Sequence, residues 1–153
     1  MNAIETYYKG YRFRSRLEAR WAVFFDAFGI DWEYEPEGYD LGDLGWYLPD
    51  FYLHDSGWFI EVKGRIEDKK ELEKARYLDN YTPMNACGCL ILGRLELIKA
   101  IHDEEGGHPD FNDAFRHFQM MTPLYTEKTI NDYNNAILKG RQARFEHGET
   151  PII

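Results

Sequence analysis

The fold is decided by two neighbouring runs of sequence, Tyr47-Leu48-Pro49-Asp50-Phe51-Tyr52-Leu53 and Trp58-Phe59-Ile60-Glu61-Val62-Lys63. Both runs are rich in aromatic and β-branched residues, and the segment between them, His54-Asp55-Ser56-Gly57, consists mostly of turn formers. This pattern predicts a β-hairpin. Pairing backwards from the middle of the turn puts Asp50 directly opposite Glu61, and a four-residue loop leads to the same register.

The opposed carboxylates are the feature that points to chemistry. Directly opposed residues have Cβ atoms about 5 Å apart, a distance at which like charges repel. A fold tolerates this arrangement when a divalent cation lies between the carboxylates, or when one of them is protonated. Lys63 lies two residues beyond Glu61 and therefore returns to the same face of the strand. Two hard oxygen ligands beside an ammonium group are typical of a Mg²⁺ site for phosphodiester hydrolysis.

The alternative is structural. Surface strands often alternate charged residues, so Asp50 could lie at a strand edge while Glu61 and Lys63 form a solvated face. The flanking sequence favours the functional interpretation. Glu61 has apolar neighbours on both sides, and Pro49 confines its strand to an edge, a start or a bend. Bends and bulges in strands often lie beside active sites.

A helix is predicted ahead of the hairpin, from Ser15 to Phe28. Ser15 followed by Glu18 is a capping-box pattern, and the apolar residues after it recur with helical period. Glu18 therefore has two interpretations. It bonds back to the Ser15 backbone N–H, or it faces the site, because it shares a stripe with Ala22 and Phe25 and a buried carboxylate needs a partner. One residue can serve both roles.

The remaining segments predict a mixed α/β order. We expect an extended segment at Tyr7–Phe13, a strand at Asp31–Leu41, a helix at Glu67–Tyr81 with Leu72, Ala75, Tyr77 and Leu78 on its inner side, and a strand at Ala86–Leu92. This last strand should run parallel to the second hairpin strand, because a helical crossover joins them. Further helices are expected at Phe111–Met121 and Thr129–Phe145.

Two sets of residues carry a resemblance to a known family. Pro49-Asp50 followed by Glu61-Val62-Lys63 resembles the signature of the PD-(D/E)xK nuclease superfamily. Two sequence segments are most similar to the endonuclease subunit of heteromeric transposases and to small actinobacterial phage nucleases. They are Ser15-Arg16-Leu17-Glu18 and Tyr47-Leu48-Pro49-Asp50-Phe51. The resemblance covers about residues 8–93. It implies an α/β, restriction-endonuclease-like core in the order α-β-β-β-α-β, with a mixed sheet flanked by helices.

The resemblance also implies an activity, which is Mg²⁺- or Mn²⁺-dependent endonucleolytic hydrolysis of DNA. Asp50 and Glu61 would bind the metal, with the backbone carbonyl of Val62 as a further ligand. Lys63 would orient the attacking water or stabilise the transition-state charge. Glu18 matches the glutamate that the first helix of the superfamily turns toward the metal, and is a candidate ligand of a second ion. Substrates of the family include duplex, branched and nicked DNA.

Nucleic-acid contacts are expected from basic residues, although the net charge is −9. The first 20 residues interleave aromatic and basic side chains, and those expected to hold phosphate are Lys9, Arg12, Arg14 and Arg16. Lys74 and Arg76, on the helix after the motif, are weaker candidates. The alternative in each case is a solvated surface. Because acidic residues gather at 31–43 and 103–105, we expect weak, salt-sensitive binding.

Length and composition set the remaining expectations. A chain of 153 residues, 44% hydrophobic, is sized for one domain over residues 1–153, with a nuclease-like core and a helical extension from about residue 100. No apolar run is long enough to span a membrane, and the N-terminus does not resemble a signal peptide. Cys87 and Cys89 lack the second pair that a zinc site needs. We expect a cytoplasmic protein, of a bacterial cell or a phage, with no membrane partner.

Two alternatives to the enzyme remain open. The chain could be a catalytically inactive nucleic-acid-binding module on the same fold, or a module for phage–host interaction, which the acidic surface allows. The complete set Glu18, Asp50, Glu61 and Lys63 argues against an inactive copy. Many members of the family cut both strands as dimers, so a homodimer is also open.

Overall fold

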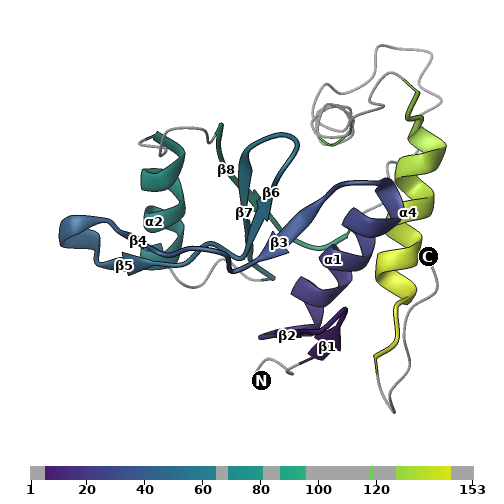
Figure 1. Cartoon of the computed structure of the whole chain (residues 1–153), viewed down its shortest axis with the longest axis horizontal. Helices are drawn as coiled ribbons and strands as arrows, with labels where there is room; N and C mark the ends of the chain where they lie inside the picture. The colour runs from purple at the N-terminus through teal and green to yellow at the C-terminus, as the bar shows by residue number, and fades with distance from the viewer. Residues whose placement is uncertain (1–5, 65–68, 81–86, 96–117, 119–126, 146–153) are drawn as a thin grey trace.

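The computed structural model describes residues 6–64, 69–80, 87–95, 118 and 127–145 (Figure 1). This part of the chain forms three α-helices, a four-stranded mixed sheet and two small hairpins. The elements are β1 (Thr6–Tyr8), β2 (Tyr11–Phe13), α1 (Arg16–Phe28), β3 (Trp32–Tyr34), β4 (Tyr39–Asp40), a 3₁₀ turn (Gly42–Leu44), β5 (Trp46–Tyr47), β6 (Phe51–Leu53), β7 (Trp58–Val62), α2 (Lys69–Asn80), β8 (Gly88–Leu92) and α4 (Ile130–Gln142).

The central sheet has the strand order β3-β6-β7-β8. β6 pairs antiparallel with β3 and β7, whereas β8 lies parallel to β7 after the α2 crossover. Phe51 pairs with Ile60 and Leu53 with Trp58, which confirms the predicted register of the hairpin. The predicted parallel strand is also confirmed. Apart from the β4–β5 hairpin and its 3₁₀ turn, which are inserted between β3 and β6, the elements α1, β3, β6, β7, α2 and β8 follow one another as an α-β-β-β-α-β series.

Two predicted strands are shorter than expected. The strand predicted at Asp31–Leu41 ends at Tyr34, because Glu35 takes a positive φ of 46° and Pro36 follows it. The chain then starts a separate hairpin of β4 and β5. The strand predicted to start at Tyr47 is also interrupted. Pro49 separates β5 from β6, because proline has no backbone N–H to donate to the strand ladder.

The sheet lies between two helical layers (Figure 1). Along β7 the side chains alternate, so Ile60 and Val62 join the core under α1, while Phe59 joins the core under α2. α4 packs on the outer side of α1. Gly140 allows this close approach, because a Cβ atom there would lie 2.7 Å from the Arg20 carbonyl oxygen.

The helices agree with the sequence in most respects. α1 begins after Ser15 as predicted, and α4 lies within the predicted range, with Thr129 and Asp132 forming a capping box. On α2, the predicted inner residues are buried except Tyr77, which is 38% exposed because it lies on the opposite side of the helix from Leu72, Ala75 and Leu78. The helix predicted at 111–121 falls outside the described residues except for Phe118, which is buried. No helix in the described part of the chain is long and apolar enough to cross a membrane.

Candidate active site

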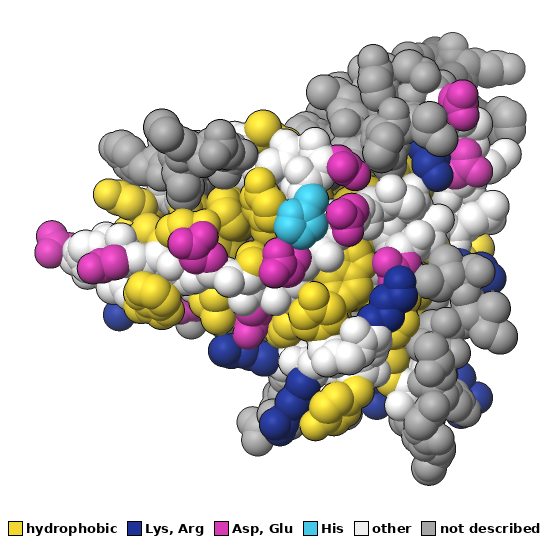
Figure 2. Space-filling view, in the orientation of Figure 1, with side chains coloured by type: hydrophobic (Ala, Val, Ile, Leu, Met, Phe, Trp, Pro, Cys, Tyr) yellow, Lys and Arg dark blue, Asp and Glu magenta, His cyan; other side chains and the backbone are white. Residues whose placement is uncertain are grey.

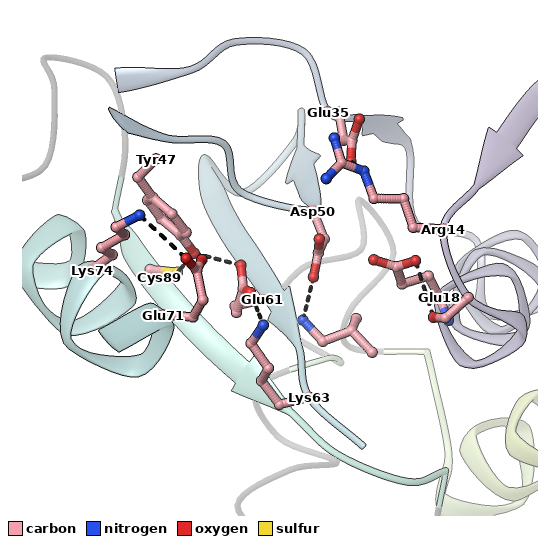
Figure 3. Close-up of polar contacts among 12 residues, drawn as sticks. Arg14, Glu18, Glu35, Tyr47, Asp50, Glu61, Lys63, Glu71, Lys74 and Cys89 are labelled. Carbon is pink, nitrogen blue, oxygen red and sulfur yellow. Dashed lines mark hydrogen bonds and ion pairs between the residues drawn. The ribbon is translucent and has the colours of Figure 1, made fainter. Parts of the chain in front are cut away.

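The β6–β7 hairpin brings Asp50 and Glu61 together at one end of the sheet (Figure 3). Asp50 immediately precedes β6, and continuing the observed register by one residue places it across from Glu61. Both side chains are buried, at 8% and 3% exposure. The solvated-face alternative is therefore wrong for these two carboxylates.

Asp50 is held by both neighbouring strands. Its backbone oxygen accepts the Glu35 N–H at 2.8 Å, and its side-chain Oδ2 accepts the Val62 N–H at 2.7 Å. Continuing the ladder would place Val62 opposite Pro49, which has no N–H to offer in return. The Asp50 carboxylate thus ends the ladder in place of a backbone acceptor, and this contact fixes where the carboxylate lies.

Glu61 is bound at both of its oxygens. Oε2 accepts the hydroxyl of Tyr47 at 2.5 Å, and Oε1 lies 3.0 Å from Nζ of Lys63, as Figure 3 shows. The predicted neighbourhood of Glu61 and Lys63 is confirmed. Tyr47 was not predicted as part of this site, because the strand break at Pro49 removes any simple spacing that would relate residue 47 to residue 61.

Glu18 lies beside the N-cap and near Asp50, but it does not make the predicted bond back to the Ser15 backbone N–H. Its backbone N–H donates to Ser15 Oγ at 3.1 Å, which confirms the N-cap. Its carboxylate does not complete the capping box on the Ser15 backbone; Oε2 instead accepts the Ser15 hydroxyl at 3.0 Å and the Tyr34 hydroxyl at 3.4 Å. The side chain is buried and close enough to Asp50 to act on its charge. Asp50 therefore lies between two glutamates (Figure 3).

The proximity of these carboxylates changes the pKa values of the site residues. Burial raises the pKa of Asp50 well above its usual value, and the charges of Glu61 and Glu18 raise it further. Burial also raises the pKa of Glu61, although the hydrogen bond from Tyr47 and the ammonium of Lys63 oppose it. For Lys63, burial lowers the pKa but the surrounding carboxylates outweigh it, so the net shift is upward and the ammonium is retained at neutral pH.

The donor set suits a hard cation, with one restriction. Asp50 and Glu61 offer carboxylate oxygens whose mutual repulsion a divalent ion would relieve. Each carboxylate also has lone pairs beyond those used in the bonds above. Across the residues that the structure describes, however, no group of three or more His, Cys, Asp or Glu side chains is placed to hold a metal ion. Glu18 thus does not join the other two in a common ligand set.

The predicted phosphate-binding residues differ in their surroundings. Lys9 pairs with Asp26 at 2.9 Å and Arg14 with Glu35 at 2.9 Å. Lys74 donates to the Trp46 carbonyl at 3.0 Å and lies 3.2 Å from Glu71. Its side chain is 12% exposed. Lys74 therefore ties α2 to β5, and its main role in the structure is this contact. The other predicted residues are exposed or half-buried: Arg12, Arg16 and Arg76.

Charge is separated on the face of the molecule that Figure 2 shows. Lys and Arg side chains gather around β1 and β2, whereas Asp and Glu side chains spread over the arm formed by β4 and β5. This distribution agrees with the sequence, where basic residues concentrate before α1 and acidic residues after it.

The whole chain was compared with protein-family models, with curated proteins and with solved structures, and no match was found in any of the three. The site geometry and the motif therefore carry the functional argument.

Proposed function

We propose that this protein is a metal-dependent endonuclease that hydrolyses phosphodiester bonds in DNA, with a PD-(D/E)xK site. One observation carries the proposal: Asp50 and Glu61 are buried and opposed at the end of a hairpin, and Lys63 lies 3.0 Å from Glu61. A fold that needed these residues only for stability would not gather two buried carboxylates beside a third.

The arrangement of elements supports the same proposal. Asp50 immediately precedes β6, Glu61 lies in β7 and Lys63 directly follows it, and β6 and β7 are the two strands at the centre of the sheet. A helix that carries a glutamate precedes them, and a helical crossover to a parallel strand follows. This is the order that a restriction-endonuclease-like core requires, and we assign that fold as part of the proposal.

Each residue of the site has a distinct task in this scheme. Asp50 and Glu61 would hold Mg²⁺ or Mn²⁺, together with the Val62 carbonyl oxygen. When bound, such an ion supplies Lewis-acid polarisation of the phosphate and a more acidic water. Lys63 stabilises the negative charge that develops on the phosphate, because its ammonium cannot ligate a cation but can donate hydrogen bonds. Glu18 lies beyond Asp50 and would act through water or on a second ion.

Binding of the nucleic acid is assigned to the basic end of the molecule. Arg12 and Arg16 lie there, beside the start of the helix that carries Glu18. Lys9 and Arg14 lie at the same end and pair with Asp26 and Glu35. Because the chain carries a net charge of −9, affinity for DNA should be weak and should fall steeply with salt.

An inactive binding module is the second candidate, and one observation favours it. Without a third ligand in common, the Asp50–Glu61 pair could hold a shared proton instead of a metal ion, with Lys63 as the counter-ion of Glu61. Such a site would be stable but catalytically inactive. Cleavage assays separate the two candidates.

The deciding experiment compares Lys63→Ala with the parent protein. Labelled duplex, nicked and branched DNA would be incubated with each protein in Mn²⁺ under single-turnover conditions. We expect Lys63→Ala to bind Mn²⁺ but to cleave at least about 10²-fold more slowly, the usual scale for losing one charge-stabilising group. Lys128→Ala is the matched control, since this lysine lies over the Phe28 ring at the C-terminal end of α1, whereas Glu18 lies in the first turn.

The outcome is read in two steps. A parent that cleaves none of the substrates points to the binding module. A parent that cleaves, together with a Lys63→Ala variant of equal rate, removes Lys63 from the mechanism and with it the assignment of this site.

A further inference from the structure

We infer that Tyr47 is a positioning residue of the active site, whose hydroxyl fixes the Glu61 carboxylate in the orientation that receives a divalent cation. The inference rests on the proposed function, because it concerns the same site. It adds a residue that lies outside the sequence motif, on a different hairpin.

The hydrogen bond between the two side chains is short and enclosed. Tyr47 is 1% exposed, and its hydroxyl donates to Glu61 Oε2 at 2.5 Å. Lys63 holds the other oxygen, Oε1, at 3.0 Å. A carboxylate bound from both sides cannot rotate without losing a charge-assisted hydrogen bond. Such bonds orient ligating carboxylates toward a metal in known sites.

Tyr47 is in turn fixed by its surroundings. It belongs to β5, where it pairs with Tyr39, and its ring packs in the core beneath α2. Lys74 on α2 donates to the carbonyl of the preceding residue, Trp46, at 3.0 Å. The hydroxyl is thus held by a pairing, a packed core and an inter-element bond, and this rigidity is what a positioning group needs.

The chain offers a matched control for the loss of such a hydroxyl. Tyr8 is also buried, and its hydroxyl donates to the Asp26 carboxylate at 2.5 Å, the same length as the bond from Tyr47 to Glu61. Asp26 belongs to α1 and binds Lys9 and the Trp32 indole, away from Asp50 and Glu61. Tyr47→Phe and Tyr8→Phe therefore remove the same chemical group from equivalent bonds, at the site and away from it.

The experiment measures Mn²⁺ binding by titration calorimetry in both variants, beside their thermal midpoints without metal. We expect the two midpoints to fall by similar amounts. Mn²⁺ affinity should fall roughly 10–100-fold in Tyr47→Phe alone, the scale for losing a partner that orients a metal ligand. In single-turnover cleavage of labelled DNA, the Tyr47→Phe defect should be larger at limiting than at saturating Mn²⁺.

A second variant keeps the test decisive if Tyr47→Phe does not fold. Lys74→Met leaves the hydroxyl in place but releases the Trp46 carbonyl, so it should weaken Mn²⁺ binding by a smaller factor. Equal Mn²⁺ affinity in the parent, Tyr47→Phe and Lys74→Met overturns the inference while the proposed function stands. Equal weakening in Tyr47→Phe and Tyr8→Phe also overturns it, because the effect is then one of stability. A parent that binds no Mn²⁺ overturns both.

Discussion

Asp26 and Asp50 are aspartates of low exposure that lie in opposite chemical surroundings. Asp26, with a side chain 13% exposed, is surrounded by donors. It accepts the Tyr8 hydroxyl at 2.5 Å and the Trp32 indole N–H at 2.9 Å, and it pairs with Lys9 at 2.9 Å. Every partner compensates its negative charge and joins the first hairpin to α1 and β3.

Asp50 has the reverse environment. It accepts one backbone N–H, from Val62, while its nearest charged neighbours include the carboxylates of Glu61 and Glu18. The contrast separates two uses of a buried acid. A carboxylate among donors stabilises the fold at once, whereas a carboxylate among carboxylates costs stability until a proton or a cation arrives. The second arrangement is the one expected of a functional site.

The same substitution at the two positions should have opposite consequences, and this is the largest effect we predict. Asp50→Asn keeps an acceptor for the Val62 N–H but removes a charge, so cleavage should fall at least about 10²–10³-fold while metal-free stability holds or rises. Asp26→Asn should retain cleavage but lower the free energy of unfolding by about 1.5–3 kcal/mol, because it weakens hydrogen bonds to a charged acceptor.

Denaturant unfolding in EDTA and single-turnover cleavage in Mn²⁺ provide the two measurements. The comparison breaks if Asp50→Asn unfolds more easily than Asp26→Asn, since Asp50 would then be a structural residue.

Metal binding should stabilise the protein only when the Asp50 carboxylate is present. A ligand that binds the native state alone adds roughly 2.7 kcal/mol at 100 times its dissociation constant. Saturating Mn²⁺ should therefore raise the melting temperature of the parent protein and of Asp26→Asn, but not that of Asp50→Asn. Differential scanning fluorimetry with Mn²⁺ against EDTA measures this shift. An equal shift in all three proteins would place metal binding elsewhere in the chain.

The parts of the site that sequence predicts are those governed by local pattern. The β6–β7 register follows from a period of two and a recognisable turn, so the sequence alone predicts that Asp50 and Glu61 are paired. The cap at Ser15 follows from local chemistry in the same way. The strand predicted at Asp31–Leu41 was too long, because Glu35 turns the chain through a positive φ. Pro36 and Gly38 mark this turn in the sequence, but the alternation of Trp32 and Tyr34 with Glu33 and Glu35 favours a continuous strand.

Contacts between distant segments were the other limit. Tyr47 reaches Glu61 only because Pro49 breaks the strand and a separate β4–β5 pairing carries Tyr47 back over the sheet. The sequence likewise predicts an exposed basic residue at Lys74, because its bond to the Trp46 carbonyl depends on how α2 packs. Such contacts depend on tertiary packing, which propensity and period do not encode.

The pH dependence of stability should sharpen the contrast further. The pKa of Asp50 is raised in the folded protein, so the folded state binds this proton more tightly than the unfolded chain does. Its contribution to stability is then fully present below its ordinary pKa, about 4, and is lost as the pH rises through the folded value. Metal-free unfolding free energy should therefore decrease from about pH 4 toward neutrality.

Asp50→Asn should flatten this slope, leaving the smaller part that Glu61 contributes. Denaturant titrations in EDTA at several pH values test the point. Parallel curves for the parent and Asp50→Asn would show that Asp50 does not titrate in this range.

The smallest predicted effect concerns Glu18, whose cap and site roles can be separated. Glu18→Gln keeps the backbone N–H that donates to Ser15 Oγ. It weakens the bonds from the Ser15 and Tyr34 hydroxyls but also relieves repulsion with Asp50, so the free energy of unfolding should change little. It removes one of the charges that act on Asp50, and an amide is a poor ligand for a hard cation. Cleavage should then fall by roughly 10-fold, within the range for an outer partner of a metal site.

Ser15→Ala is the converse control, which should lose about 1 kcal/mol of stability with less effect on the cleavage rate. If Glu18→Gln destabilised the protein as much as Ser15→Ala without slowing cleavage, Glu18 would belong to the structural group with Asp26.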